Sequence, residues 1–289
     1  MLILIGSLVG LGALILIARW VITLPAVVDF VATYPGVVRV ANAPTGFPAW
    51  LNWQHFLNIM FLALIVRTAL SIRSKKRPPF FFTRRNTGLI RTSNLPRRMS
   101  IHVWTHLSVD VLWVLNGILY IVLLFTTGQW LRIVPTSWDV LPNAASAALQ
   151  YLALDWPTEN AWVTYNSIQL LAYFVTVFVA APIAILTGVR LSNAWPARES
   201  WIRAVPERPV RWVHNATLVY FLVFVVFHVF LVVSTGILRN LNMMFAGNDG
   251  EGWVGLILAF LALDLVMAVW MLLTPQVVSR IARLFGKVQ

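Results

Sequence analysis

Six long apolar stretches constrain what this chain can fold into. Each is close to the roughly 20 residues that an α-helix needs to cross the hydrocarbon core of a bilayer. Irregular backbone and open sheet edges are not stable in lipid, so such stretches fold as helices. The sequence therefore predicts an all-α integral membrane protein with six transmembrane helices. The stretches are Leu2–Ala18, Leu51–Ile72, Val103–Thr127, Val163–Val189, Trp212–Gly236 and Trp253–Leu273.

The composition indicates a single membrane domain, residues 1–289. Of these residues, 59% are hydrophobic and 11% are charged, whereas soluble domains carry about 25% charged residues. The first stretch has no basic residue ahead of it and no clear cleavage site, so we expect a retained helix rather than a signal peptide. The chain has no cysteine, which excludes disulfides, iron–sulfur clusters and thiolate zinc sites.

The net charge of +12 follows from membrane orientation, and it does not require a nucleic-acid partner. Most of the 22 Lys and Arg residues lie in the connections 73–98 and 190–211 and in the tail 280–287. Six helices would place these three segments on the same side. Cytoplasmic loops of membrane proteins carry an excess of Lys and Arg. The pattern therefore predicts that the N-terminus, the C-terminus and the basic connections are cytoplasmic.

Two histidines in the fifth stretch, His214 and His228, lie fourteen residues apart. At about 100° per residue they share one helix face, and at ~1.5 Å rise per residue they are about 21 Å apart along the axis. Ionisable side chains at such depth are costly in lipid and mark functional sites. Iron porphyrin is the cofactor that best suits neutral imidazoles stacked in this way. We therefore predict that this helix supplies one ligand to each of two haems.

The other histidines complete two pairs at matched depths. With the basic connections inside, His55 lies near the outer surface, and His106 lies near the cytoplasm with His102 one turn nearer the water. Depth alone therefore pairs His55 with His228, and His106 or His102 with His214. The i,i+4 pair of His102 and His106 would need further ligands to bind zinc, and no such motif accompanies it. We prefer the deeper His106 as the iron ligand and expect His102 at the haem edge or the surface.

The residues around these histidines resemble a known family. The pattern is similar to the cytochrome b (gamma) subunit of respiratory formate dehydrogenase and to its relatives, the hydrogenase cytochrome b and bacterial cytochrome b561 proteins. The resemblance covers the second to fifth stretches, residues 51–236. The segments that carry it are WQHFLNIMFLALIVRTALSIR (53–73), THLSVDVLWVLNGILY (105–120), YNSIQLLAYFVTVFVAAPIAILTGVRL (165–191) and the helix of His214 and His228.

The resemblance implies a four-helix di-haem core in the bacterial inner membrane. It implies two haem b groups, one between His55 and His228 and the other between His106 and His214. Such proteins are electron-transfer subunits of respiratory-chain oxidoreductases rather than independent enzymes, and they connect a partner enzyme to the quinone pool. The resemblance also places Asn166, with Gln169, beside the quinone at the His55/His228 end. The alternative for Asn166 is an ordinary residue at a helix start.

The chain departs from the family pattern in its extra helices, 2–18 and 253–273, and in its orientation. The basic connections invert the core relative to formate dehydrogenase, so the quinone end faces outward and the His106/His214 end faces the cytoplasm. We therefore expect a cytoplasmic partner oxidoreductase, with a molybdenum-cofactor enzyme as the first candidate. Membrane lipid is the other expected partner, and a homo-oligomer is compatible with the pattern.

Three charged residues lie within the apolar stretches. Arg67 and Asp110 lie at similar depth, so an ion pair would relieve the desolvation of both. Alternatively, Arg67 holds a haem propionate and Asp110 orients His106. Asp264 is central in the last stretch and suits a proton path or burial against the core. Because His and Asp relays also occur in transporters, the alternative function is a haem-free proton-coupled transporter or a membrane scaffold subunit.

Overall fold

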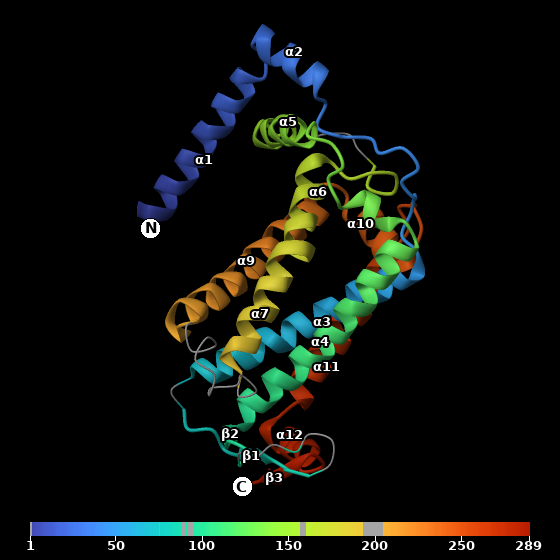
Figure 1. Ribbon diagram of the computed structural model, residues 1–289. Helices are drawn as coiled ribbons and strands as arrows, with labels where there is room; N and C mark the ends of the chain where they lie inside the picture. The colour runs from blue at the N-terminus through green and yellow to red at the C-terminus, as the bar shows by residue number, and fades with distance from the viewer. Residues whose placement is uncertain (1, 75, 88–90, 92–94, 157–159, 193–204) are drawn as a thin grey trace.

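The computed structural model describes residues 2–74, 76–87, 91, 95–156, 160–192 and 205–289, which are mostly α-helical (Figure 1). Five of the six predicted membrane helices are confirmed as helices that are long and apolar enough to cross a bilayer. The first stretch, α1 (Leu2–Val21), passes the same test only together with α2 (Pro25–Thr33), across a bend of 83°. The five are α3 (Ala49–Arg73), α4 (Ile101–Thr126), Ser167–Leu191, α9 (Glu207–Ser234) and α11 (Val254–Leu272).

The third of these helices changes its hydrogen-bond register in the middle. It consists of α6 (Ser167–Phe174), a π-helical turn η3 (Val175–Ala180) and α7 (Ala181–Leu191). Pro182, in the first turn of α7, has no N–H to donate, and its ring would clash with the carbonyl four residues earlier in a regular α-helix. A π-helical turn is one way to absorb such a mismatch, and these turns occur frequently at functional sites.

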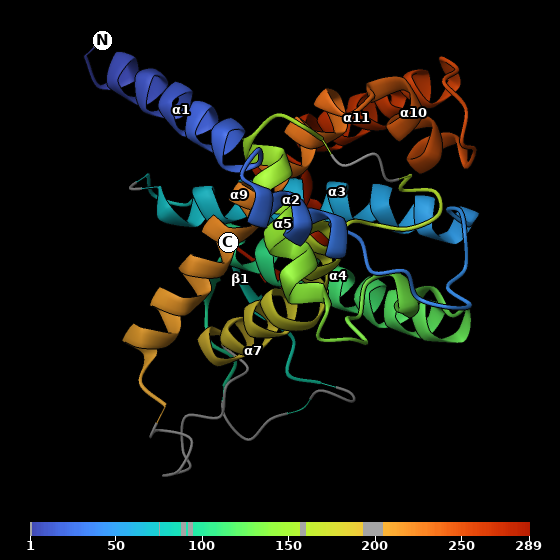
Figure 2. The same cartoon turned by 90° about the horizontal axis from the view of Figure 1, so that it is seen from above.

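The core helices form two pairs that face each other. Helix α3 packs along α4, and α7 packs along α9, while α11 packs against α3. Figure 1 shows the two pairs separated in the centre of the molecule. Helix α1 contacts α5 (Val140–Leu152) and diverges from the bundle, which Figure 2 shows from above. The two extra helices therefore lie beside the predicted four-helix core.

Two connections cover the end of the bundle away from the basic segments. Figure 1 shows α2 and α5 lying across this end. Buried hydrogen bonds anchor the connections, such as Gly36 N to Asn143 Oδ1 at 2.9 Å and Ser167 N to Gly36 O at 2.9 Å. On the same side, α10 (Ile237–Leu241) and the π-helical η4 (Asn242–Ala246) follow α9 and pack on α11.

The mostly helical structure is consistent with the predicted all-α class, and a small sheet lies at the other end of the bundle. Its strands are β1 (Phe81–Arg84), β2 (Met99–Ser100) and β3 (Gly286–Val288), in the antiparallel order β2-β1-β3. Together with α12 (Pro275–Ala282), the sheet buries a small core of Phe82, Ile101, Val278 and Ala282. The position of Gly286 requires glycine, because a Cβ there would overlap the carbonyl oxygen of Thr83.

Candidate cofactor site

A cavity of about 2780 Å³ lies between the two helix pairs. Sites for drug-sized ligands measure roughly 300–1,000 Å³, so this cavity has room for more than one large ligand. Its walls are largely apolar and come mainly from α3, α4, α6, α7 and α9, with contributions from η3, η4 and α11. Four of the five histidines line it, namely His55, His106, His214 and His228.

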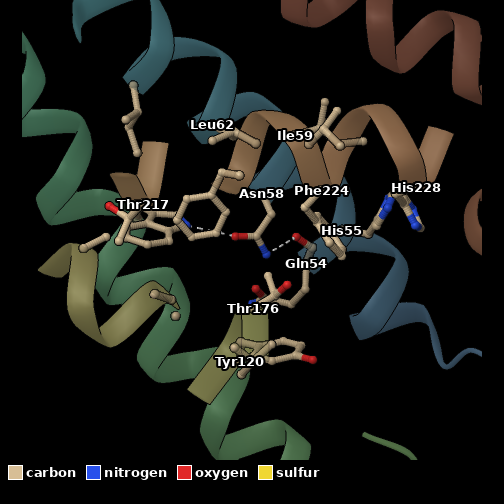
Figure 3. A pocket seen from close by; sticks show the side chains of 18 of the residues that line it. Gln54, His55, Asn58, Ile59, Leu62, Tyr120, Thr176, Thr217, Phe224 and His228 are labelled. Carbon is tan, nitrogen blue, oxygen red and sulfur yellow. Dashed lines mark hydrogen bonds between the residues drawn. The ribbon is translucent and has the colours of Figure 1, made fainter. Parts of the chain in front are cut away.

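The structure brings His55 of α3 and His228 of α9 together at one end of the cavity (Figure 3). The centroids of the two rings are 6.2 Å apart, and their planes are inclined by 56°. Phe224 stacks on the His228 ring at 5.6 Å, and Phe245 of η4 meets the His55 ring edge-on at 5.7 Å. The Nδ1 atom of His55 is buried and has no hydrogen-bond partner among the described residues.

The separation of the two rings is compatible with a metal ion held between two imidazoles. A histidine nitrogen binds a metal at about 2.0 Å, and the ring centroid lies ~1 Å beyond it, so two rings on opposite sides of one metal have centroids about 6 Å apart. The observed 6.2 Å matches that separation. No group of three or more His, Cys, Asp or Glu side chains in the described part of the chain is placed to hold a metal ion. Two imidazoles per site suit haem, because the porphyrin supplies the remaining ligands.

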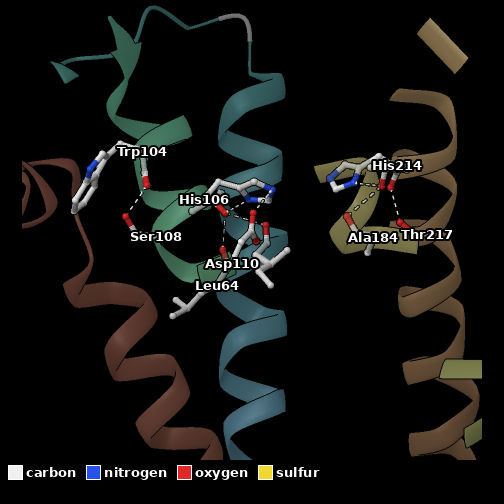
Figure 4. A network of polar contacts seen from close by, with 11 residues as sticks. Leu64, Trp104, His106, Ser108, Asp110, Ala184, His214 and Thr217 are labelled. Atoms are coloured by element: carbon white, nitrogen blue, oxygen red, sulfur yellow. Dashed lines mark hydrogen bonds and ion pairs between the residues drawn. The ribbon is translucent and has the colours of Figure 1, made fainter. Parts of the chain in front are cut away.

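At the other end of the cavity, two threonines contact the remaining histidines in the same way. The hydroxyl of Thr68 on α3 lies 2.7 Å from Nδ1 of His106 on α4, and the hydroxyl of Thr187 on α7 lies 2.9 Å from Nδ1 of His214 on α9. Figure 4 shows the His106 and His214 rings pointing toward each other from the two helix pairs. Each ring is therefore held by the neighbouring helix of its own pair.

The contacts of the two threonines favour a proton on Nδ1 of each ring. Each hydroxyl also lies within hydrogen-bond distance of the backbone carbonyl four residues earlier, at 2.9 Å for Thr68 and 2.6 Å for Thr187. A hydroxyl has one hydrogen, which it donates to this carbonyl, so its oxygen accepts from the histidine. In this arrangement each histidine carries its proton on Nδ1, and its Nε2 is left without a proton.

The structure places Asp110 beside His106, as one of the sequence-based alternatives expected, but it does not bring Asp110 and Arg67 together. An oxygen of Asp110 lies 3.6 Å from Nε2 of His106, on the ring nitrogen opposite to the one that Thr68 contacts. Thr68, rather than Asp110, therefore orients the ring through Nδ1. Among the described residues, Arg67 forms no ion pair with Asp110, and its guanidinium lies over the Trp270 ring instead.

His102 and Arg67 do not line the histidine cavity. Both line a second, smaller cavity near the start of α12. The basic side chains that line the main cavity at its His106/His214 end include Arg73 and Arg211, which the sequence analysis did not single out. A signal for them was available, because both lie at the ends of the histidine-bearing helices next to the basic connections.

Asn166 and Gln169 form the start of α6. The side-chain oxygen of Asn166 accepts from the backbone N–H of Gln169 at 2.9 Å, and that of Gln169 accepts from the backbone N–H of Asn166 at 3.1 Å. The Asn166 amide also donates to the hydroxyl of Tyr151 at 2.6 Å, and the side chain is fully buried. Asn166 thus has the role of a helix cap, and of the two residues only Gln169 lines the cavity.

Several polar residues of the cavity wall were missed by the sequence analysis. Gln54, one residue before His55, is 3% exposed, and its side-chain oxygen has no partner among the described residues (Figure 3). The buried Arg132 donates to the Gly46 carbonyl at 2.6 Å and lies over the Tyr165 ring at 4.7 Å. Burial raises the pKa of Tyr165, and the Arg132 charge opposes this shift.

Asp264 lies outside the site. It is exposed on α11 between exposed apolar residues such as Leu263 and Leu265. The expectation that it packs against the core is therefore wrong, because the face of α11 that packs on the bundle carries Gly255, Ala259 and Val266 instead.

No protein-family model matches this chain, and comparisons with curated proteins and with solved structures found no significant match either.

Proposed function

We propose that this chain is the membrane electron-transfer subunit of an oxidoreductase complex, with two haem b groups in its histidine cavity. The observation that carries the proposal is the pairing of four histidines along one apolar cavity, with His55 and His228 at the ring separation that a shared iron requires. In this proposal the chain resembles the cytochrome b subunits of formate dehydrogenase and hydrogenase in function as well as in sequence pattern.

The residues of the two ends have distinct tasks in this proposal. His55 and His228 bind one iron, and His106 and His214 bind the other. Haem supplies a one-electron centre when it is bound, while the protein provides its ligands, orientation and electrostatic surroundings. Arg73 and Arg211 line the His106/His214 end and provide positive charge for the propionate groups.

The partners belong to opposite ends of the bundle. We expect quinone at the His55/His228 end, where Gln169 lines the cavity and its amide suits a quinone carbonyl. The partner oxidoreductase is expected at the His106/His214 end, beside the basic connections and the small sheet. In a bacterial inner membrane that end is cytoplasmic if positive charge stays inside, and a molybdenum-cofactor enzyme is the first candidate.

The test is a dithionite-reduced minus oxidised spectrum of the purified protein, with haem quantified per chain. We expect a sharp b-type band and about two haems per chain, in keeping with two histidine pairs. His106→Ala should lose one haem. His102→Ala is the matched control one turn away, and it should keep both. A folded protein that binds no haem when haem is supplied would exclude the proposal.

A further inference from the structure

A second cavity, of about 260 Å³, lies at the basic end of the bundle between α3, α4 and the start of α12. Its size suits a small polar group rather than a cofactor, for which roughly 300–1,000 Å³ is usual. The polar part of its wall includes Arg67 and Ser71 from α3 and His102 and Thr105 from α4. The apolar part is Leu273, Pro275 and Val278.

The charge of this cavity is positive and uncompensated. No acidic residue lines it, and within the described chain Arg67 has no ion pair. The guanidinium lies 5.6 Å from the centroid of the Trp270 ring, and this cation–π contact does not use its N–H donors. A cation within a membrane-spanning helix is costly without a counter-ion. The cavity is therefore complementary to an anion.

The anion is not a haem propionate in this arrangement, because the two cavities are separate. Thr68 lies between them: it lines the second cavity, and its hydroxyl contacts the His106 ring, which lines the first. Arg67 and His102 line only the second cavity. An anion bound there approaches from outside the bundle.

The location of the cavity identifies the source of the anion. Helix α12 begins three residues after α11 ends and is amphipathic: Val277, Val278 and Ile281 lie on one face, and Gln276 and Arg280 lie on the other. A short amphipathic helix directly after a membrane-spanning helix lies at the bilayer interface, at the depth of the lipid headgroups. The exposed basic residues that follow, including Arg283, add to the attraction of anionic lipid.

We propose that Arg67 and His102 bind the phosphate group of an anionic phospholipid, whose acyl chains lie along the apolar residues of α11 and α12. The guanidinium supplies the charge and the planar pair of donors that suits phosphate. The His102 ring supplies a further N–H. This proposal does not depend on haem binding.

The experiment measures lipid binding to the full chain, purified and delipidated in detergent, by native mass spectrometry and by thermal unfolding. Phosphatidylglycerol should bind and raise the unfolding temperature, whereas phosphatidylcholine should have a much smaller effect. Arg67→Gln should weaken the phosphatidylglycerol effect at least ten-fold, and His102→Gln should weaken it less. An undiminished response in Arg67→Gln would overturn the proposal.

Arg98→Gln is the matched control. The Arg98 guanidinium lies 4.2 Å from the centroid of the Phe81 ring, so this change removes the same charge and a similar aromatic contact. Arg98 does not line the cavity, and its variant should bind phosphatidylglycerol like the wild type. If Arg67→Gln does not fold, Arg67→Lys keeps the charge but loses the planar donors, and it should still bind more weakly. Equal affinity of Arg67→Lys and wild type would then contradict the proposal.

Two further outcomes identify other occupants. If inorganic phosphate stabilises the wild type as much as phosphatidylglycerol does and has no effect on Arg67→Gln, the site binds free phosphate. That result would overturn the proposal of a lipid ligand. An Arg67→Gln protein that loses haem while its lipid response is unchanged would return Arg67 to a propionate role and overturn the proposal. Lipid binding can be read in protein with or without haem, so its failure is distinct from failure of the proposed electron-transfer function.

Discussion

The two histidine pairs of the cavity are built in different ways. At the His106/His214 end, a threonine hydroxyl from the neighbouring helix holds Nδ1 of each ring at 2.7 and 2.9 Å. At the other end, Nδ1 of His55 is buried without a hydrogen-bond partner in the described chain, and aromatic rings surround the pair. One pair is oriented by hydrogen bonds and the other by packing.

The difference has chemical consequences for a metal ligand. A hydrogen bond from the second ring nitrogen fixes the tautomer and makes the ligand more basic. A more basic ligand favours the oxidised iron and so lowers the reduction potential. Packing fixes the orientation of a ring but leaves its basicity unchanged. In the proposed function, the threonines therefore bias the His106/His214 end toward giving electrons to the other end.

The largest expected effect comes from removing one ligand at each end in turn. His228→Ala should lower the haem content from about two to about one per chain, and His214→Ala should do the same. In a redox titration, His228→Ala should keep the potential of the His106/His214 pair, and His214→Ala should keep that of the His55/His228 pair. Identical remaining potentials would show that the two ends are equivalent and would remove the basis of the comparison.

The next effect tests the hydrogen-bonded end. Thr68→Val and Thr187→Val keep the side-chain shape but remove the acceptor for the Nδ1 proton, and changes of this kind cost about 10–100-fold in metal affinity. We expect weaker haem retention and a higher potential at this end alone, measured by titration of haem into the apoprotein and by redox titration.

Two controls sharpen this result. Thr68→Ser should have the same reduction potential as the wild type, because serine keeps the hydroxyl. Thr217→Val also removes a cavity hydroxyl, but that hydroxyl bonds the backbone carbonyl of His214 at 2.8 Å and not its ring. A potential that moves as much in Thr217→Val as in Thr187→Val would mean that the ring hydrogen bond is not the cause.

A smaller effect is expected at the packed end. Phe224 stacks on the His228 ring with the two planes inclined by 8°. Aromatic pairs of this kind contribute about 0.5–1.5 kcal/mol beyond burial, so Phe224→Leu should weaken haem binding at this end by roughly two- to twelve-fold. Phe230→Leu, on the same helix but exposed and outside the cavity, is the matched control. Equal haem affinities in the two variants would argue against orientation by packing.

The smallest effect concerns the connection that follows the packed end. Arg239 donates to Asp249 at 2.7 Å, and this hydrogen bond lowers the pKa of Asp249 below its ordinary value of 3.8. The stabilisation is therefore present above pH 3.8 and is lost as the pH falls through the lowered pKa. Exposed ion pairs contribute about 0–1 kcal/mol. We expect Asp249→Asn to unfold at most a few degrees lower at pH 7, with the difference vanishing in acid.

This last measurement also has a clear contrary result. A change of haem content at the His55/His228 pair in Asp249→Asn would show that the connection with Arg239 and Asp249 affects this pair. The contact would then pass through Phe245 of η4. A difference from wild type that grows in acid would contradict the stated sign.

The apolar lengths and the histidine positions were readable from the sequence because both depend on local periodicity. The bounds of α3, α4, α9 and α11 agree with the predicted stretches within a few residues, apart from the start of α9, which lies five residues earlier. Counting depth along these helices also suggested that His55 and His228 are neighbours, and the structure places them side by side. The ligand role itself stays a prediction.

The sheet of β1–β3 could not be predicted in the same way. Its strands are two to four residues long, and they pair Phe82 with Met99 and with Val288, which is far away in the chain. No strand of that length has a periodic signal, because its stability comes from partners supplied by the fold.

The sequence by itself determined that this chain forms apolar helices and that its histidines lie at matched depths, because helix length and rise are properties of consecutive residues. Only the tertiary structure decided what each polar side chain contacts. Rotation about the helix axes placed Thr68 and Thr187 against imidazoles, turned Arg67 and His102 toward a separate cavity, and left Asp264 exposed. Those rotations result from packing between helices, which no single helix specifies.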